Sequence, residues 1–177
     1  MRKLILLTLL LVVFFAMSAS AAVINFDDLP DEVVPDGYQN VTWFGDWTNY
    51  TEPQDPYNPH SPPGRVYDFL NDAMFQFNSA VQFNGAWFAG QPTTTVQFEG
   101  FLNGQMVFSS DVLTTSNVPT FLSSNYNGMV DTIHVLSNAP DFFIMDDVTY
   151  NEVPEPGSLV LMGTGLAGLA GYLRRKF

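Results

Sequence analysis

Short apolar runs separated by turn-forming residues dominate the chain between residues 23 and 151. These runs are rich in Val, Phe, Tyr, Trp and Thr, are interrupted by Gly, Pro, Asn and Asp, and show almost no helical periodicity. The pattern predicts β-strands at residues 23–26, 38–43, 74–77, 80–83, 94–101, 105–113, 130–136 and 142–150. So many short strands in one domain predict an all-β fold, a two-sheet β-sandwich of the jelly-roll type.

Two connections in this domain have a distinctive composition. Asn103-Gly104 separates two of the predicted strands, and because Asn and Gly accept the positive φ of a type I′ turn, it predicts a tight hairpin. Residues 49–64 contain five prolines and predict a stiff, extended loop. A loop of that length is either functional or a variable surface segment.

The N-terminus has the three parts of a secretory signal peptide. Met1-Arg2-Lys3 is followed by an uncharged apolar run over residues 4–15 and then by small residues over 16–22. The apolar run is short for a membrane span, which needs about 20 residues. We therefore predict that signal peptidase cleaves before Ala22 or Val23, and that residues 1–22 are absent from the exported protein.

The C-terminus combines a proline-containing linker, an apolar segment and a basic end. Val153, Pro154, Glu155 and Pro156 separate the domain from residues 159–173, which carry no charge, and Arg174, Arg175 and Lys176 follow. A helix of fifteen residues reaches about 22 Å, against a hydrocarbon core of about 30 Å. We predict a marginal transmembrane helix whose basic end stays in the cytoplasm, leaving the domain outside.

These three elements at residues 153–177 resemble the PEP-CTERM sorting signal of Gram-negative bacteria. The resemblance implies that an exosortase, a membrane cysteine protease-transpeptidase, recognises the Pro-Glu-Pro motif and removes the tail. The expected organisation is a signal peptide (1–22), an acidic β-sandwich (23–151) and a sorting signal (152–177). The protein would be exported across the inner membrane, anchored transiently, and then left at the cell surface or outside the cell.

The charge of the domain is strongly one-sided. Of the six Lys and Arg residues only Arg65 lies between residues 23 and 151, together with sixteen of the eighteen Asp and Glu, a net charge of −15 with His neutral. Such a surface repels phosphate backbones and excludes nucleic acid as a partner. It also repels acidic polysaccharide unless divalent cations bridge the two. The absence of Cys excludes disulfides.

Two acidic pairs, Asp27-Asp28 and Asp146-Asp147, lie at the first and last predicted strands. These strands commonly lie side by side in a jelly roll, which would bring the carboxylates together. Strand alternation places Asp146 among apolar neighbours and Asp147 on the opposite face. A buried carboxylate needs a partner, and calcium, which prefers oxygen ligands, is suitable. The alternative is that these acids cap turns and face solvent.

The segments ending at Asp28 and Tyr150, with a Gly37-Tyr38…Trp43 strand between them, resemble the small β-sandwich domains that precede this sorting signal. Those domains are similar to the jelly rolls of carbohydrate-binding modules. The resemblance implies a structural calcium held by Asp27 or Asp28 together with Asp146.

Aromatic residues around the proline-rich loop are candidates for glycan binding, because aromatic faces stack on sugar rings. Trp47, Tyr50 and Tyr57 flank or lie in that loop, although most aromatics of a sandwich belong to its core. Catalysis has little support, because the two histidines lack zinc-site spacing and no serine nucleophile motif is present.

The sequence therefore favours a non-catalytic surface or matrix protein associated with exopolysaccharide, with glycan binding as its candidate activity. Two alternatives stay open: a secreted glycoside hydrolase or lyase of jelly-roll fold, and a purely structural matrix protein. A facing carboxylate pair in a cleft would favour the enzyme, and an aromatic surface would favour binding.

Overall fold

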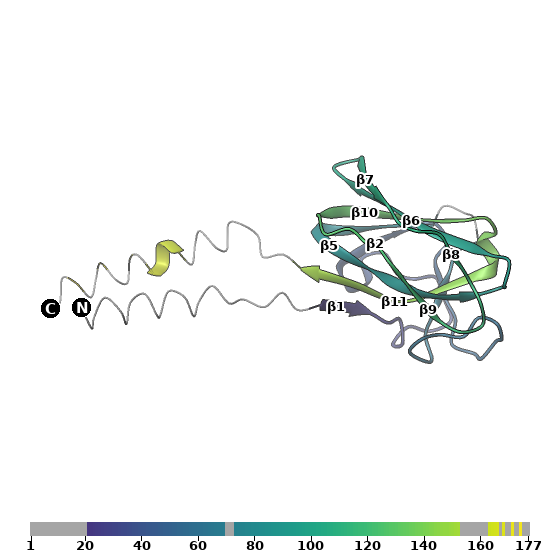
Figure 1. Ribbon diagram of the computed structural model, residues 1–177. Helices are drawn as coiled ribbons and strands as arrows, with labels where there is room; N and C mark the ends of the chain where they lie inside the picture. The colour runs from purple at the N-terminus through teal and green to yellow at the C-terminus, as the bar shows by residue number, and fades with distance from the viewer. Residues whose placement is uncertain are drawn as a thin grey trace, which may run out of the picture.

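The computed structural model describes residues 21–69 and 73–152, with residues 163–166, 168, 171 and 174 near the C-terminus (Figure 1). The predicted signal peptide up to residue 20, the Pro-Glu-Pro motif at 153–156, and Arg175 and Lys176 lie outside the described residues. So does most of the predicted transmembrane segment. Among the residues that are described, no helix is long and apolar enough to cross a membrane.

The regular secondary structure of the described domain is almost entirely antiparallel β-strand. They are β1 (Ala21–Ile24), β2 (Val41–Phe44), β3 (Thr48–Asn49), β4 (Val66–Tyr67), β5 (Met74–Gly90), β6 (Thr95–Leu102), β7 (Gln105–Ser109), β8 (Leu113–Thr114), β9 (Thr120–Ser123), β10 (Val130–Ser137) and β11 (Phe143–Glu152). Two short 3₁₀ turns, η1 (Tyr38–Asn40) and η2 (Pro140–Phe142), precede β2 and β11. The all-β sandwich predicted from the sequence is confirmed.

The long strand β5 connects the two parts of the sandwich. Its first residues pair with β2 on one side and β10 on the other, and its last residues pair with β9 and β11. The sheet continues from β10 through β6 to β7, and from β11 through β4 to β3. In Figure 1, β6, β7 and β10 lie in the upper part of the domain, with β1, β9 and β11 in the lower part.

Aromatic side chains fill the space between these two parts. Phe83 of β5 meets Phe98 of β6 edge to face, with ring centroids 4.9 Å apart, although the two strands are not neighbours in the sheet. Phe75, Phe88 and Phe143 are also buried. Burying such side chains is the main stabilising contribution available to a domain without disulfides.

Two more detailed predictions about strand pairing are confirmed. The first and last strands are neighbours, because β1 pairs with β11 from Ala21↔Asn151 to Ile24↔Val148. Strands β6 and β7 form a hairpin closed by Asn103 (φ 52°) and Gly104 (φ 76°), both in the left-handed region that a type I′ turn requires.

Several strand limits differ from the predicted ones. Residues 74–77 and 80–83, predicted as two strands, belong to the single strand β5, which continues through the exposed Asn78 and Ser79 while its register against β10 shifts. The predicted strand 105–113 is divided into β7 and β8, and 38–43 begins with η1. Strands β3, β4 and β9 were not predicted, because the first two have only two residues each and depend on tertiary pairing.

Candidate functional site

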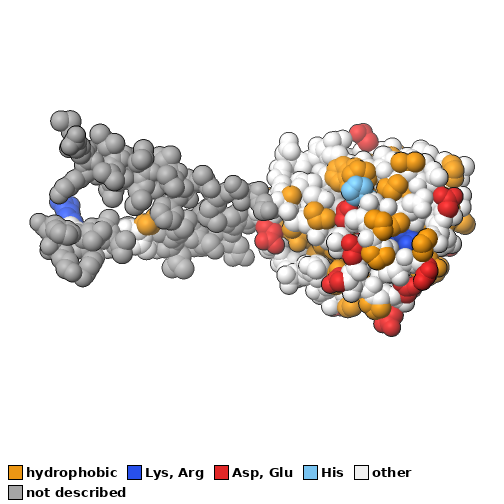
Figure 2. Space-filling model, turned by 90° about the horizontal axis from the view of Figure 1, so that it is seen from below, with side chains coloured by type: hydrophobic (Ala, Val, Ile, Leu, Met, Phe, Trp, Pro, Cys, Tyr) orange, Lys and Arg blue, Asp and Glu red, His pale blue; other side chains and the backbone are white. Residues whose placement is uncertain are grey.

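A cleft of about 350 Å³ lies beside the proline-rich loop, where that loop meets β4 and the start of β11. Its walls are mostly aromatic, with polar groups at a few positions; the lining residues are Tyr50, Gln54, Tyr57, Arg65, Tyr67, Phe69, Asp141, Phe143 and Ile144. We call this the tyrosine cleft. The face in Figure 2 carries hydrophobic side chains around a basic one, with acidic side chains nearby.

The buried side chain of Asn49 fixes the first wall of the tyrosine cleft. Its amide donates to the carbonyls of Leu29 (2.9 Å) and Pro30 (3.2 Å), and its side-chain oxygen accepts from the Arg65 backbone N–H (3.1 Å). The Tyr50 N–H then donates to the Arg65 carbonyl at 2.9 Å. Because Asn49 is fully buried and uses both ends of its amide, Tyr50 and Arg65 are held in a fixed relation.

Of the three glycan-binding candidates, Tyr50 and Tyr57 line the tyrosine cleft and Trp47 does not. Trp47 is fully buried, its indole N–H donates to the Met74 carbonyl at 3.1 Å, and its ring packs edge to face on Trp43. This position corrects the expectation for Trp47, since a core ring has no face available to a sugar. The lining also contains Tyr67, an aromatic candidate ranked below these three in the sequence, and Phe69, which sequence reasoning missed.

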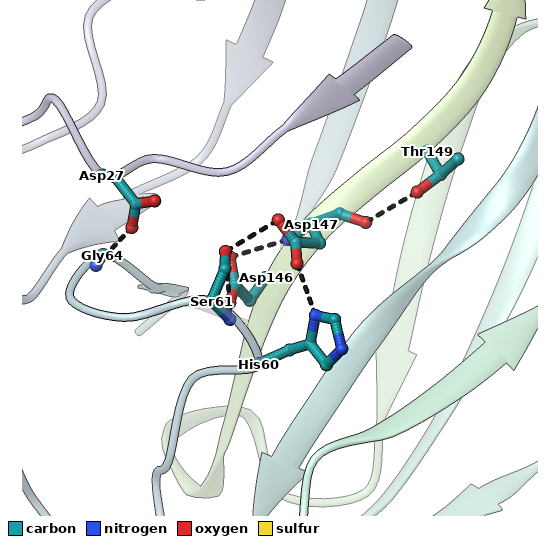
Figure 3. A network of polar contacts seen from close by, with 7 residues as sticks. All are labelled: Asp27, His60, Ser61, Gly64, Asp146, Asp147 and Thr149. Carbon is teal, nitrogen blue, oxygen red and sulfur yellow. Dashed lines mark hydrogen bonds and ion pairs between the residues drawn. The ribbon is translucent and has the colours of Figure 1, made fainter. Parts of the chain in front are cut away.

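A second group of polar side chains lies where the proline-rich loop crosses β11 (Figure 3). The Ser61 backbone N–H donates to Asp146 Oδ2 at 2.8 Å, and the Ser61 hydroxyl donates to Asp147 Oδ1 at 2.9 Å. His60 Nδ1 lies 2.5 Å from Asp147 Oδ2. These contacts fasten the loop to the last strand across more than eighty residues of sequence.

Both aspartates reach Ser61 because β11 is irregular at this point. Asp147 has a φ of 47°, and the register against β5 shifts between Asp146 and Thr149. The bulge turns the side chain of Asp147 toward the loop, so the predicted alternation of Asp146 and Asp147 onto opposite faces is wrong. Asp146 is fully buried and Asp147 almost so.

Burial raises the pKa of Asp146 from 3.8 to about 7, because an ionised carboxylate loses its hydration there. The charges of Asp147 and Asp27 act in the same direction, while hydrogen bonds from the backbone N–H groups of Ser61 and Asp147 oppose the rise. Arg65 is the single Lys or Arg of the domain and was the expected partner of a buried acid. Its guanidinium instead donates hydrogen bonds to backbone carbonyls.

The other acidic pair is divided between two partners. Asp27 accepts from the Gly64 N–H at 2.9 Å and lies close to the Asp146 group (Figure 3), whereas Asp28 accepts from the Tyr38 hydroxyl at 2.5 Å. Burial and the neighbouring Asp28 raise the pKa of Tyr38.

The predicted calcium ligands are therefore not gathered around one point. Within the described part of the chain, no group of three or more His, Cys, Asp and Glu side chains has an arrangement that could hold a metal ion. The oxygens of Asp146 and Asp147 accept hydrogen bonds from Ser61, His60 and the Asp147 N–H instead. Calcium at Asp27, Asp28 and Asp146 stays a prediction.

His60 was missed as a site residue, although it lies in a loop that the sequence marks as unusual. Its ring stacks on Trp87 of β5, with centroids 3.6 Å apart and planes 11° from parallel, and Phe121 of β9 packs on the same indole. The side chain of His60 is 40 % exposed. Stacking and the contact with Asp147 together hold this end of the loop against the sheet.

The comparison with known families identifies the C-terminal segment. Residues 152–176 match the PEP-CTERM protein-sorting motif. The PEP-CTERM motif marks an exported protein that an exosortase sorts to the cell surface. No curated protein matches the chain.

Solved structures with a similar arrangement are carbohydrate-binding modules. One family 29 carbohydrate-binding module is 15 % identical, with 81 % of this chain and 99 % of that chain covered and a TM-score of 0.40. Two variants of CBM29-2, from the same family, are each 16 % identical over 78 % of this chain and 99 % of theirs, with TM-scores of 0.37 and 0.39.

Proposed function

We propose that this exported protein is a non-catalytic, exopolysaccharide-associated component of the cell surface or matrix, and that its β-sandwich binds glycan in the tyrosine cleft. The observation that carries the proposal is the composition of the cleft. Tyr50, Tyr57 and Tyr67 supply aromatic rings that stack on the C–H faces of sugars, and Gln54 supplies amide donors and acceptors for hydroxyl groups. A volume of about 350 Å³ lies within the range of about 300–1,000 Å³ found for ligand sites.

The same lining argues against the enzymatic alternative. Glycoside hydrolysis requires two carboxyl groups that flank the scissile bond. Among the described residues of the tyrosine cleft, Asp141 is the single acid. The acidic pair on β11, Asp146 and Asp147, is buried and accepts hydrogen bonds from Ser61 of the proline-rich loop.

Isothermal titration calorimetry tests the proposal. It measures the binding of oligosaccharide fragments prepared from the exopolysaccharide of the bacterium that produces the protein. Tyr57→Ala should weaken binding by about fivefold or more, since the loss of one stacked ring from a small site costs about 1–3 kcal/mol. Tyr126→Ala is the matched control, because Tyr126 is a half-buried tyrosine stacked on Phe108 outside the cleft. If neither wild type nor control binds any fragment, the glycan-binding function is contradicted.

A further inference from the structure

Arg65 has unusual surroundings for a charged side chain. It is 1 % exposed and lines the tyrosine cleft. Its guanidinium donates to two backbone carbonyls, those of Tyr50 (3.1 Å) and Glu52 (2.5 Å), and stacks under the Tyr50 ring with 4.9 Å between the guanidinium carbon and the ring centroid. Its Nε–H is buried and has no hydrogen-bond partner among the described residues.

Among the described residues no ion pair of Arg65 is found, although the charges of Asp31 and Asp146 act on its guanidinium. Buried cations in proteins are normally paired with a carboxylate, because leaving water is costly for an ion. Sixteen acidic residues are present between residues 23 and 151, yet the ion pair found among the described residues joins His60 and Asp147. Burial lowers the pKa of Arg65, but arginine stays protonated in proteins.

A cation held in this way places a positive charge at the inner wall of the cleft, although the net charge of the domain is negative. Two of the five guanidinium N–H groups are used by the backbone, so the group keeps donor capacity as well as charge. The nearby aromatic rings exclude water and strengthen its interaction with a bound anion.

We propose that Arg65 makes the tyrosine cleft selective for an acidic sugar, a unit that carries a carboxylate, and this inference rests on the glycan-binding function proposed above. The aromatic walls hold the ring of such a unit, and its carboxylate faces the guanidinium. A carboxylate also suits the planar, donor-rich guanidinium better than a neutral hydroxyl does.

The net charge of the domain does not prevent this selectivity. At physiological ionic strength charges are screened beyond about 8 Å, so distant surface acids contribute little. Asp141, an exposed acid, lies in the cleft lining itself, whereas Asp31 and Asp146 act on Arg65 from outside that lining. It therefore offers a way to change the electrostatics of the cleft without disturbing Arg65.

The test compares fragments of the host's exopolysaccharide before and after chemical reduction of their carboxyl groups, with the full exported protein and a chelator in every sample. Reduction converts each uronic acid into the neutral sugar and keeps the linkages. Native fragments should bind about tenfold tighter than reduced ones, the gain expected from one charge-assisted hydrogen bond. The difference should shrink as the salt concentration rises.

Asp141→Asn is the decisive variant, since it removes the negative charge of the cleft lining. The hydrogen bonds that Arg65 donates to the Tyr50 and Glu52 carbonyls do not involve Asp141. The variant should strengthen binding of native fragments by about threefold, a Coulombic effect at water-like dielectric, and leave reduced fragments unchanged. Arg65→Met should abolish the preference, provided that circular dichroism shows a folded variant. If it is unfolded, Asp141→Asn decides whether the carboxylate is bound in the tyrosine cleft that Arg65 lines, and an unchanged affinity for native fragments overturns the inference.

Each outcome bears on one of the two proposals. Equal binding of native and reduced fragments would overturn the acidic-sugar inference and leave glycan binding in place. So would a preference that Tyr57→Ala and Asp141→Asn both leave unchanged, because the selective site would then lie elsewhere. A preference that is absent with chelator and appears only when calcium replaces the chelator would assign it to cation bridging and overturn the inference. Absence of binding by either fragment would overturn both proposals.

Discussion

The buried carboxyl of Asp146 should make the stability of the domain depend on pH well above the range in which ordinary carboxylates titrate. Its pKa is about 7 in the folded protein, against 3.8 for an exposed aspartate. Between these values the folded protein keeps a proton that the unfolded chain has released. The free energy of unfolding therefore falls as the pH rises from about 4 to about 7, and Asp146 contributes no further change outside that window.

The size of the effect follows from the two pKa values. Each pH unit within the window is worth about 1.36 kcal/mol for a single proton, so the full interval from 3.8 to about 7 amounts to about 4 kcal/mol. Asp146 is fully buried, so solvent screening does not reduce this value greatly. For a domain whose total stability is about 5–15 kcal/mol, this is a large share.

The assay is urea denaturation at half-unit steps between pH 5 and pH 8, in the presence of a chelator. Wild type should lose about 2–3 kcal/mol between pH 5 and pH 7, and Asp146→Asn should lose much less. The readout is the slope of the free energy of unfolding against pH. The absolute stability of Asp146→Asn is not used, because it also changes: an Asn side chain has one oxygen and cannot replace both carboxylate oxygens that accept from the Ser61 N–H and the Asp147 N–H. Asp36→Asn, at an exposed acid, controls for the overall negative charge.

His60→Gln is measured in parallel, so that a proton bound by the imidazole is distinguished from the proton of Asp146. This control is needed because His60 contacts Asp147, the residue next to Asp146 in the chain. The reasoning is refuted if Asp146→Asn keeps the wild-type slope, or if Asp36→Asn flattens the slope as much as Asp146→Asn does. A slope that disappears only in His60→Gln would assign the proton to the histidine.

Three other predictions follow from the same structure. If calcium binds at Asp27, Asp28 and Asp146, adding it at a hundredfold excess over Kd should stabilise the domain by about 2.7 kcal/mol, which is a melting shift of several degrees. Sodium at equal ionic strength should not raise the melting temperature in this way, and Asp146→Asn should not respond to calcium. Gly64→Ala should destabilise the domain by more than 1 kcal/mol, as seen by thermal melting, because its Cβ would lie 2.5 Å from the Phe26 backbone; an unchanged melting temperature contradicts this. Intact mass of the protein from its host should show a start near Ala22 or Val23 and an end near Pro156, and a secreted species that retains Arg174 would contradict removal of the sorting signal.

The parts of the fold that could be predicted are those fixed by local chemistry. Asn103-Gly104 forms its turn because the two residues accept positive φ whatever surrounds them. The pairing of β1 with β11 was predictable only through the expected jelly-roll arrangement. In contrast, Asn78-Ser79 has the composition of a turn, yet β5 continues through it because β2, β10 and β11 pair with its two halves.

The site could be predicted only in part, because its geometry depends on contacts between distant segments. Tyr50 and Tyr57 were found from their place in the proline-rich loop, whereas Trp47 next to it is in the core, and sequence does not distinguish the two environments. The bulge at Asp147 reverses the direction of one carboxylate and has no local sequence signature. Arg65 was recognised only as the domain's single cation, since its burial in the cleft wall and its bonds to backbone carbonyls are properties of the folded structure.

The central claim, that this exported domain binds glycan in the tyrosine cleft, is tested most directly by mapping the contact surface. Amide chemical shifts of the ¹⁵N-labelled exported protein are recorded while exopolysaccharide fragments are added. We expect the largest changes at Tyr50, Tyr57, Tyr67 and Asp141, around the cleft, and none at the β6–β7 hairpin around Asn103. Saturable changes centred on another surface, or no changes at millimolar fragment, would contradict the account.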